Sequence, residues 1–119
     1  MANEIKENLT TVYPNPETGR LTDFMLFYLP VSSEEMAVVG NNGYLTSIEI
    51  PSAVEWNGTR YAVTRIEDEA FSKCSRLKSI FVPISIKSYG NNAFKGCNAE
   101  ITEEVVLEKG NILSDAILL

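Results

Sequence analysis

The side chains best suited to chemistry in this chain are two cysteines and several short runs of carboxylates. Cys74 and Cys97 stand 23 residues apart, which is not the close pair that usually begins a zinc site. The sequence contains no histidine, so the usual general base and the commonest zinc ligand are missing. We therefore expect two buried free thiols that pack as small apolar groups, with a disulfide as the alternative, and no metal or cofactor.

The carboxylates cluster in three runs, Glu34-Glu35, Glu67–Glu69 and Glu103-Glu104. Paired carboxylates perform acid–base catalysis only where a pocket separates their pKa values. Short acidic runs in turns are normally solvated. We therefore expect no catalytic residues and a protein that is not an enzyme.

The length and the net charge of the chain argue against further classes of function. The chain has 119 residues, 45% of them hydrophobic, with 10 Lys and Arg against 16 Asp and Glu. This size fits one domain with its own core, and the net charge of −6 argues against nucleic-acid binding. No apolar run is long enough to form a transmembrane segment, and the polar start lacks a secretory signal pattern.

An internal repeat organises the second half of the chain. Residues Ile66–Cys74 and Tyr89–Cys97 share a large apolar first residue, an Ala-Phe pair and a cysteine, at a spacing of 23. Just upstream of each, Ser47–Val54 and Ser79–Ile86 share a second pattern at a spacing of 32. The nine extra residues of the first copy fall near residues 55–65, where Asn57-Gly58 between β-forming residues predicts an inserted hairpin.

Each repeat unit combines a short strand with a return segment. Apolar residues alternate with Glu49 and Phe81, which is the period-2 pattern of a strand with one buried face, and a proline then ends each strand. The return segments carry Ala, Phe and Cys at a spacing that favours a short helical or 3₁₀ turn. The expected core positions are Ile48, Ile50, Ile66, Ala70, Phe71, Cys74, Leu77, Ile80, Val82, Ala93, Phe94 and Cys97.

The string Ile-x-x-x-Ala-Phe-x-x-Cys-x-x-Leu-x-x-Ile-x-Val-Pro, from Ile66 to Pro83, resembles the BspA-like class of bacterial leucine-rich repeats. The second copy, Ile86–Cys97, fits the same pattern, and the resemblance covers roughly residues 46 to 98. It implies a mainly β fold with short helical turns, namely a short leucine-rich-repeat solenoid with a β-hairpin as its N-terminal cap. It also implies a bacterial surface or extracellular location.

The flanking segments complete this scheme. Residues 1–20 are a polar leader, in which two prolines and a glycine should break any regular element, and residues 21–45 form the N-terminal β cap, a hairpin of Phe24–Leu29 and Met36–Val39. The repeats occupy residues 46–108. Their third strand is expected at Glu104–Glu108, because two inserted residues would align Val105 and Leu107 with Ile80 and Val82. Residues 109–119 would form a C-terminal cap segment.

The candidate partner contacts lie where strand side chains point outward. If the apolar strand residues face the core, four others share the opposite face: Ser47, Glu49, Ser79 and Phe81. Trp56 and Tyr61 are a second candidate pair, unless they pack on each other across the inserted hairpin.

The functional expectation is a non-catalytic protein–protein recognition module of a bacterial surface or secreted protein, with adhesion to host or microbial proteins as one form. It would take an unidentified protein partner, and a homodimer stays open. The alternative is a purely structural capping or dimerisation module with no ligand of its own. A small hydrolase or carbohydrate-binding protein is a more distant alternative.

Overall fold

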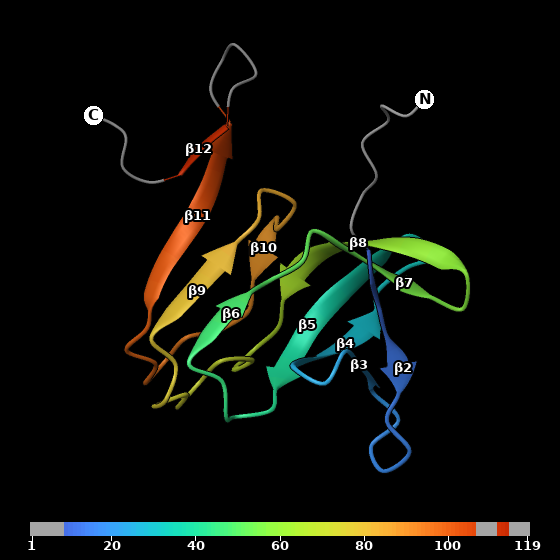
Figure 1. The fold of residues 1–119 in the computed structure, drawn as a ribbon, viewed down its shortest axis with the longest axis horizontal. Helices are drawn as coiled ribbons and strands as arrows, with labels where there is room; N and C mark the ends of the chain where they lie inside the picture. Colours follow the sequence, from blue (N-terminus) through green and yellow to red (C-terminus); the bar gives the residue numbers. More distant parts are fainter. Residues whose placement is uncertain (1–8, 107–111, 115–119) are drawn as a thin grey trace.

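The computed structural model describes residues 9–106 and 112–114 of the chain, which form two β-sheets around one core (Figure 1). The described residues contain no helix, so the prediction of a mainly β fold is confirmed. The larger sheet has the order β1 (Thr10–Thr11), β7 (Ala53–Trp56), β8 (Thr59–Ile66), β5 (Glu35–Asn41), β4 (Leu26–Pro30), β3 (Leu21–Thr22) and β2 (Tyr13–Pro14), and β10 (Ser88–Tyr89) also pairs with β8. The smaller sheet has the order β12 (Ile112–Ser114), β11 (Glu100–Val106), β9 (Ser79–Val82) and β6 (Ser47–Glu49).

The repeated strands β6, β9 and β11 lie side by side and run parallel (Figure 1). Ile80 of the central strand stands in register with Ile48 on one side and Ile101 on the other. Ile48 and Ile80 are buried, as the period-2 pattern requires.

The return segments are successive turns, so the predicted short helical turns are wrong. Backbone N–H groups of Glu69, Phe71 and Lys73 donate to carbonyls of the next repeat, those of Asn91, Ala93 and Lys95, at 3.1, 2.8 and 2.8 Å. Glu69 and Lys73 also have positive φ angles of 59° and 60°, which a right-handed helix excludes. The N–H groups of Ala70 and Ser72 donate within the segment, to the carbonyls of Glu67 and Glu69 at 3.2 and 3.1 Å. Bonds within one turn therefore alternate with bonds between repeats, and no continuous helix forms.

The third strand differs from its predicted register. Ile101 pairs with Ile80 and Glu103 with Val82, so no two-residue insertion precedes the strand, which begins at Glu100 rather than Glu104. The N–H of Glu100 donates to the Lys78 carbonyl at 2.9 Å and fixes this register from its first residue. Ile101 and Val105 are consequently 41% and 42% exposed on the core side of the last parallel strand. Leu107 and most of the predicted C-terminal cap lie outside the described residues.

The N-terminal third is more ordered than the sequence suggested. Strands β4 and β5 form the antiparallel pair expected of two apolar runs, and β5 then pairs parallel with β8. The prediction that residues 1–20 hold no regular element is wrong for residues 10–14. In this segment β1 pairs with β7 and β2 pairs with β3, and Val12, which separates β1 from β2 in the chain, is buried. The larger sheet curls around the core, so the described part is not clearly an open solenoid (Figure 1).

The core joins residues from both sheets. Nine of the expected core residues are buried in it, namely Ile48, Ile50, Ile66, Ala70, Phe71, Leu77, Ile80, Val82 and Ala93. Cys74, Phe94 and Cys97 are half-buried and pack against this cluster. The rings of Phe71 and Phe94 stack with centroids 5.5 Å apart and planes 7° from parallel, which places the two repeat turns directly over one another.

Removing the Phe71 ring tests whether this stack carries the core. We expect Phe71→Ala to lower the free energy of unfolding by about 3–5 kcal/mol, because the side chain is fully buried, and Phe94→Ala by about 1–2 kcal/mol, because Phe94 is half-buried. Urea denaturation followed by circular dichroism measures both. A loss below about 1 kcal/mol for Phe71→Ala would contradict the assigned core.

A second prediction concerns Gly90, which begins the second return segment. A β-carbon added at Gly90 would clash with the backbone nitrogen and the side-chain oxygen of Asp68 in the turn below. We expect Gly90→Ala to destabilise the fold by about 2–3 kcal/mol, since the backbone cannot yield as a flexible side chain can. Gly40→Ala is the matched control, because its β-carbon would meet only side-chain atoms at 3.4 and 3.6 Å. Equal effects in urea denaturation would show that the turns do not depend on close approach.

Candidate functional site

The outer face of β6, β9 and β11 carries side chains in rows across the three strands. The first row is Ser47, Ser79 and Glu100, and the second is Glu49, Phe81 and Thr102. Residues of one row are neighbours because parallel strands lie about 4.8 Å apart. The hydroxyls of Ser47 and Ser79 are 3.0 Å apart and hydrogen-bonded. The structure therefore brings the four predicted strand-face residues, Ser47, Glu49, Ser79 and Phe81, together on one face, and we call the two rows the strand face.

A hollow of about 710 Å³ adjoins the strand face. Ser47, Glu49 and Phe81 line it from the smaller sheet, together with Glu104 of β11. Its remaining lining comes from the N-terminal third, from the segment between β6 and the start of β7, and from the residue after β9: Leu9, Thr10, Met25, Ile50, Pro51, Ser52, Ala53 and Pro83. The half-buried Phe81 ring thus stands where a flat strand face meets a concave surface.

The charges around this hollow have one sign. Glu49 is exposed and Glu104 is half-buried, and no lysine or arginine is among the described residues that line the hollow. One Glu104 carboxylate oxygen accepts a hydrogen bond from the N–H of Ile84 at 2.8 Å, which holds that side chain at the rim. The site therefore combines an aromatic ring and hydroxyls with negative charge.

Trp56 and Tyr61 do not join the strand face. They lie on β7 and β8 of the larger sheet, with ring centroids 6.1 Å apart and planes tilted by 40°. Both rings are half-buried and pack against the core. The two rings therefore pack on each other across the inserted hairpin, which was the alternative to a partner contact.

The two cysteines are free and half-buried, and they form no disulfide. Asn41 donates from its side-chain amide to the Cys74 sulfur at 3.3 Å and to the Ala70 carbonyl at 2.9 Å. Burial raises the pKa of the Cys74 thiol, while the hydrogen bond from Asn41 acts in the opposite direction. Cys74 therefore serves as part of the packing between β5 and the first turn rather than as a reactive thiolate.

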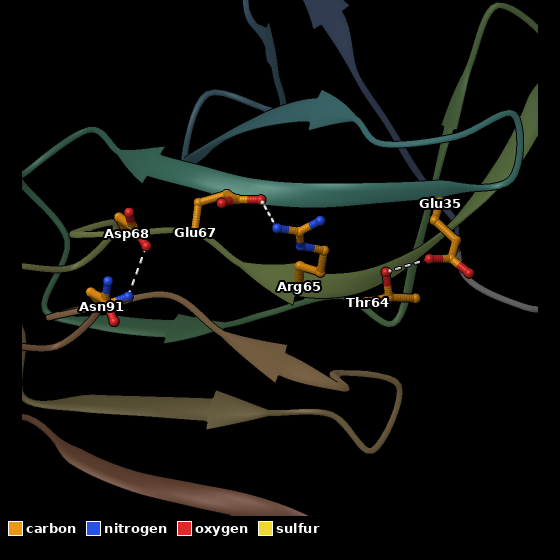
Figure 2. Close-up of polar contacts among 6 residues, drawn as sticks. All are labelled: Glu35, Thr64, Arg65, Glu67, Asp68 and Asn91. Atoms are coloured by element: carbon orange, nitrogen blue, oxygen red, sulfur yellow. Dashed lines mark hydrogen bonds and ion pairs between the residues drawn. The ribbon is translucent and has the colours of Figure 1, made fainter.

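The acidic runs at Glu34-Glu35 and Glu67–Glu69 make polar contacts with nearby residues and do not line the hollow, whereas Glu104 of the third run does. Figure 2 shows the Arg65 guanidinium 3.0 Å from Glu67 and the Thr64 hydroxyl donating to Glu35 at 3.0 Å. It also shows Asp68 accepting the N–H of Asn91 at 2.7 Å, a bond between successive turns. In the described residues, no three histidine, cysteine or acidic side chains gather as a group that could hold a metal ion.

Tyr89, in the second repeat, makes a further hydrogen bond to an acidic side chain. Its hydroxyl donates to Glu103 at 2.8 Å and its ring lies 6.0 Å from that of Phe94. Burial raises the pKa of Tyr89, and the bond to Glu103 adds to this effect. The pair ties the second repeat to β11.

Phe24 is a feature that the sequence did not reveal. It precedes β4 instead of starting it, has a φ of 75°, and is 75% exposed. Its N–H donates to the Thr22 hydroxyl at 2.9 Å, and its carbonyl accepts the Asn42 side-chain amide at 2.8 Å. A bulky residue in the left-handed region costs about 1–2 kcal/mol, so the surrounding bonds impose this conformation.

Asp23 builds the rest of that turn. One oxygen of its carboxylate accepts the N–H groups of Met25 and Leu26 at 3.0 and 2.8 Å, and the other accepts the Tyr28 hydroxyl at 2.9 Å. Burial, reinforced by the Asp23 charge, raises the pKa of Tyr28, so that this hydroxyl stays a donor. A sequence pattern of apolar residues gives no signal for such a turn.

Comparisons with known proteins extend this description. The model of the family described as "BspA type Leucine rich repeat region (6 copies)" matches residues 40–111, which is more than half of the chain. No curated protein matches the chain significantly.

Two solved structures share the fold. A leucine-rich cell surface protein from Faecalibacterium prausnitzii A2-165 has a TM-score of 0.62 and 21% identity, over 86% of this chain and 24% of its own. A leucine-rich repeat protein from Bacteroides capillosus ATCC 29799 has a TM-score of 0.59 and 24% identity, over 66% of this chain and 59% of its own. The chain thus spans about a quarter of the first protein. The described part of the chain contains no helix with the length and apolar character that a membrane span requires.

The strain at Phe24 leads to a stability prediction. We expect Phe24→Asn to raise the free energy of unfolding by about 0.5–1 kcal/mol, because asparagine adopts the left-handed conformation at lower cost. Phe24→Ala is the matched control, since it removes the exposed ring but keeps the backbone penalty, and it should change stability by less than about 0.5 kcal/mol. Urea denaturation compares the two. Destabilisation by both substitutions would show that the ring stabilises the fold.

Proposed function

Because the chain belongs to the family of BspA-type leucine-rich repeats, we propose that it is a non-catalytic protein–protein recognition module. Leucine-rich-repeat domains typically mediate protein interactions, and one protein of the same fold is described as a cell surface protein. We propose a bacterial surface or extracellular location on the same grounds, with adhesion to host or microbial proteins as one form of the activity. In this proposal the parallel stack of β6, β9 and β11 is the start of a solenoid, and β4–β5 is its N-terminal cap.

The strand face is the observation that supports this proposal most directly. Phe81 lies half-exposed at its centre, beside Glu49 in the same row and next to the 710 Å³ hollow. Aromatic side chains that sit among polar neighbours often dominate the energetics of an interface. Phe81 can supply apolar contact area, while Ser47, Ser79 and Glu49 supply hydrogen bonds and charge at its edge.

A second candidate function has its own support. Ile101 and Val105 expose apolar area on the core side of β11. Because β12 pairs with β11 only from Glu104 to Val106, a further repeat could stack beside residues 100–103. In that case the module would extend or pair repeat arrays through its end and need no ligand. Sedimentation of wild type and an Ile101→Lys, Val105→Lys variant tests this alternative. A dimer that only the wild type forms would favour it, and identical monomers would count against it.

A strand-face variant tests the recognition proposal. Immobilised wild type and a Phe81→Ala, Glu49→Gln variant are exposed to bacterial surface and host extracellular extracts, and the retained proteins are quantified. We expect the double variant to bind the retained partner at least about 10-fold more weakly, because it loses the central ring and a charge.

The matched control is Tyr44→Ala, Glu17→Gln, which removes an exposed aromatic ring and an exposed carboxylate outside the strand face. Unchanged urea denaturation of both variants shows that folding is intact. If the two variants retained the same partners as the wild type, the strand face would not be the recognition surface.

A further inference from the structure

We propose that the hollow beside β6 binds an extended, lysine- or arginine-bearing segment of a protein partner. The cation would lie over the Phe81 ring, between Glu49 and Glu104, and the segment's backbone would pair with the free edge of β6. This inference rests on the proposed recognition function and names the chemistry of the partner.

Charge carries the first part of the argument. Glu49 and Glu104 line the hollow, Glu100 extends the strand face next to it, and no described lining residue is cationic. One Glu104 oxygen accepts the Ile84 N–H, whereas the described residues give the exposed Glu49 carboxylate no hydrogen bond or ion pair. A cationic side chain would neutralise this negative potential, and an acidic or phosphorylated segment would be repelled.

The Phe81 ring makes the site selective for a cation rather than for any polar group. Phe81 lies in the same row as Glu49, and Glu104 is two residues beyond Thr102, the row partner of Phe81 on β11. Phe81 therefore stands on the strand between those that carry Glu49 and Glu104, and all three side chains line the hollow. A cation within about 6 Å of an aromatic centroid gains attraction from the ring, and flanking carboxylates add to it.

The backbone of β6 explains why the segment would be extended. The Ile50 N–H donates to the Phe81 carbonyl at 3.0 Å, and the Thr46 carbonyl accepts the N–H of Lys78 at 2.7 Å. The even-numbered residues of this segment therefore direct their backbone groups toward β9. In a parallel sheet the alternate residues, here Ser47 and Glu49, direct their backbone groups to the other side. None of the described strands pairs with β6 on that side, and both residues line the hollow. An added strand would satisfy these groups.

Defined peptides test the charge. The probes are three seven-residue peptides with blocked ends, in which threonine alternates with lysine, glutamine or glutamate, measured by isothermal titration calorimetry. We expect the lysine peptide to bind at least about 10-fold more tightly than the glutamine peptide, with binding that weakens as salt is raised, and the glutamate peptide not to bind.

Variants place the site. Glu49→Gln should weaken binding of the lysine peptide about 3-fold and Phe81→Ala about 5- to 10-fold, whereas Glu17→Gln, which removes an exposed carboxylate outside the hollow, should leave it unchanged. Methylating alternate backbone nitrogens of the lysine peptide should reduce binding at least about 10-fold if the segment pairs with β6.

Three outcomes would overturn the inference. They are equal binding of the lysine and glutamine peptides, equal effects of Glu49→Gln and Glu17→Gln, or a dimer of the free protein that Phe81→Ala dissociates, which would make a second copy the occupant. The proposed recognition function is judged separately. If the strand-face variant still lost its extract partner while no peptide bound, recognition would stand and the cationic segment would be rejected.

Discussion

The hydrogen bonds between successive repeat turns determine most of this structure. The N–H groups of Glu69, Phe71 and Lys73 donate one repeat upward, so two turns must lie at the spacing of neighbouring strands. That spacing stacks Phe71 on Phe94 and makes glycine necessary at position 90, where a β-carbon would clash with Asp68. The same spacing leaves each segment as successive single turns rather than a continuous helix. It also fixes the register of the parallel strands that follow. The rows of the strand face are thus a consequence of backbone bonding on the opposite side of the core.

Periodicity explains which parts of the fold the sequence could predict. Alternation around Glu49 and Phe81 identified two strands and their buried faces, and the repeated Ala-Phe pair identified the stack, because burial selects residue type directly. The turn conformation was mispredicted because spacing alone cannot distinguish bonds within a segment from bonds between segments. The register of β11 was mispredicted because its apolar positions are exposed, so burial no longer selects them.

The candidate site divides in the same way. That Ser47, Glu49, Ser79 and Phe81 share a face follows from the two-residue period and the repeat. The hollow depends on Leu9, Thr10 and Met25, which reach it through pairing of the N-terminal third with the larger sheet. Such long-range contacts leave no local pattern. The Phe24 turn is set by polar side chains that bond to nearby backbone, and a hydrophobicity pattern does not report those bonds.

The inserted hairpin has a consequence for how the chain folds. Asn57 and Gly58 form the two-residue loop between β7 and β8, and both have positive φ angles, 56° and 82°. Closing so short a loop costs little conformational entropy. By contrast, pairing of β6 with β9 joins residues that are 32 positions apart, such as Ser47 and Ser79. Hairpins form in about 1–10 microseconds, and non-local parallel pairing is slower. We expect β7–β8 to form early and to serve as a template, so the interruption of the repeat would set the order in which the repeats assemble.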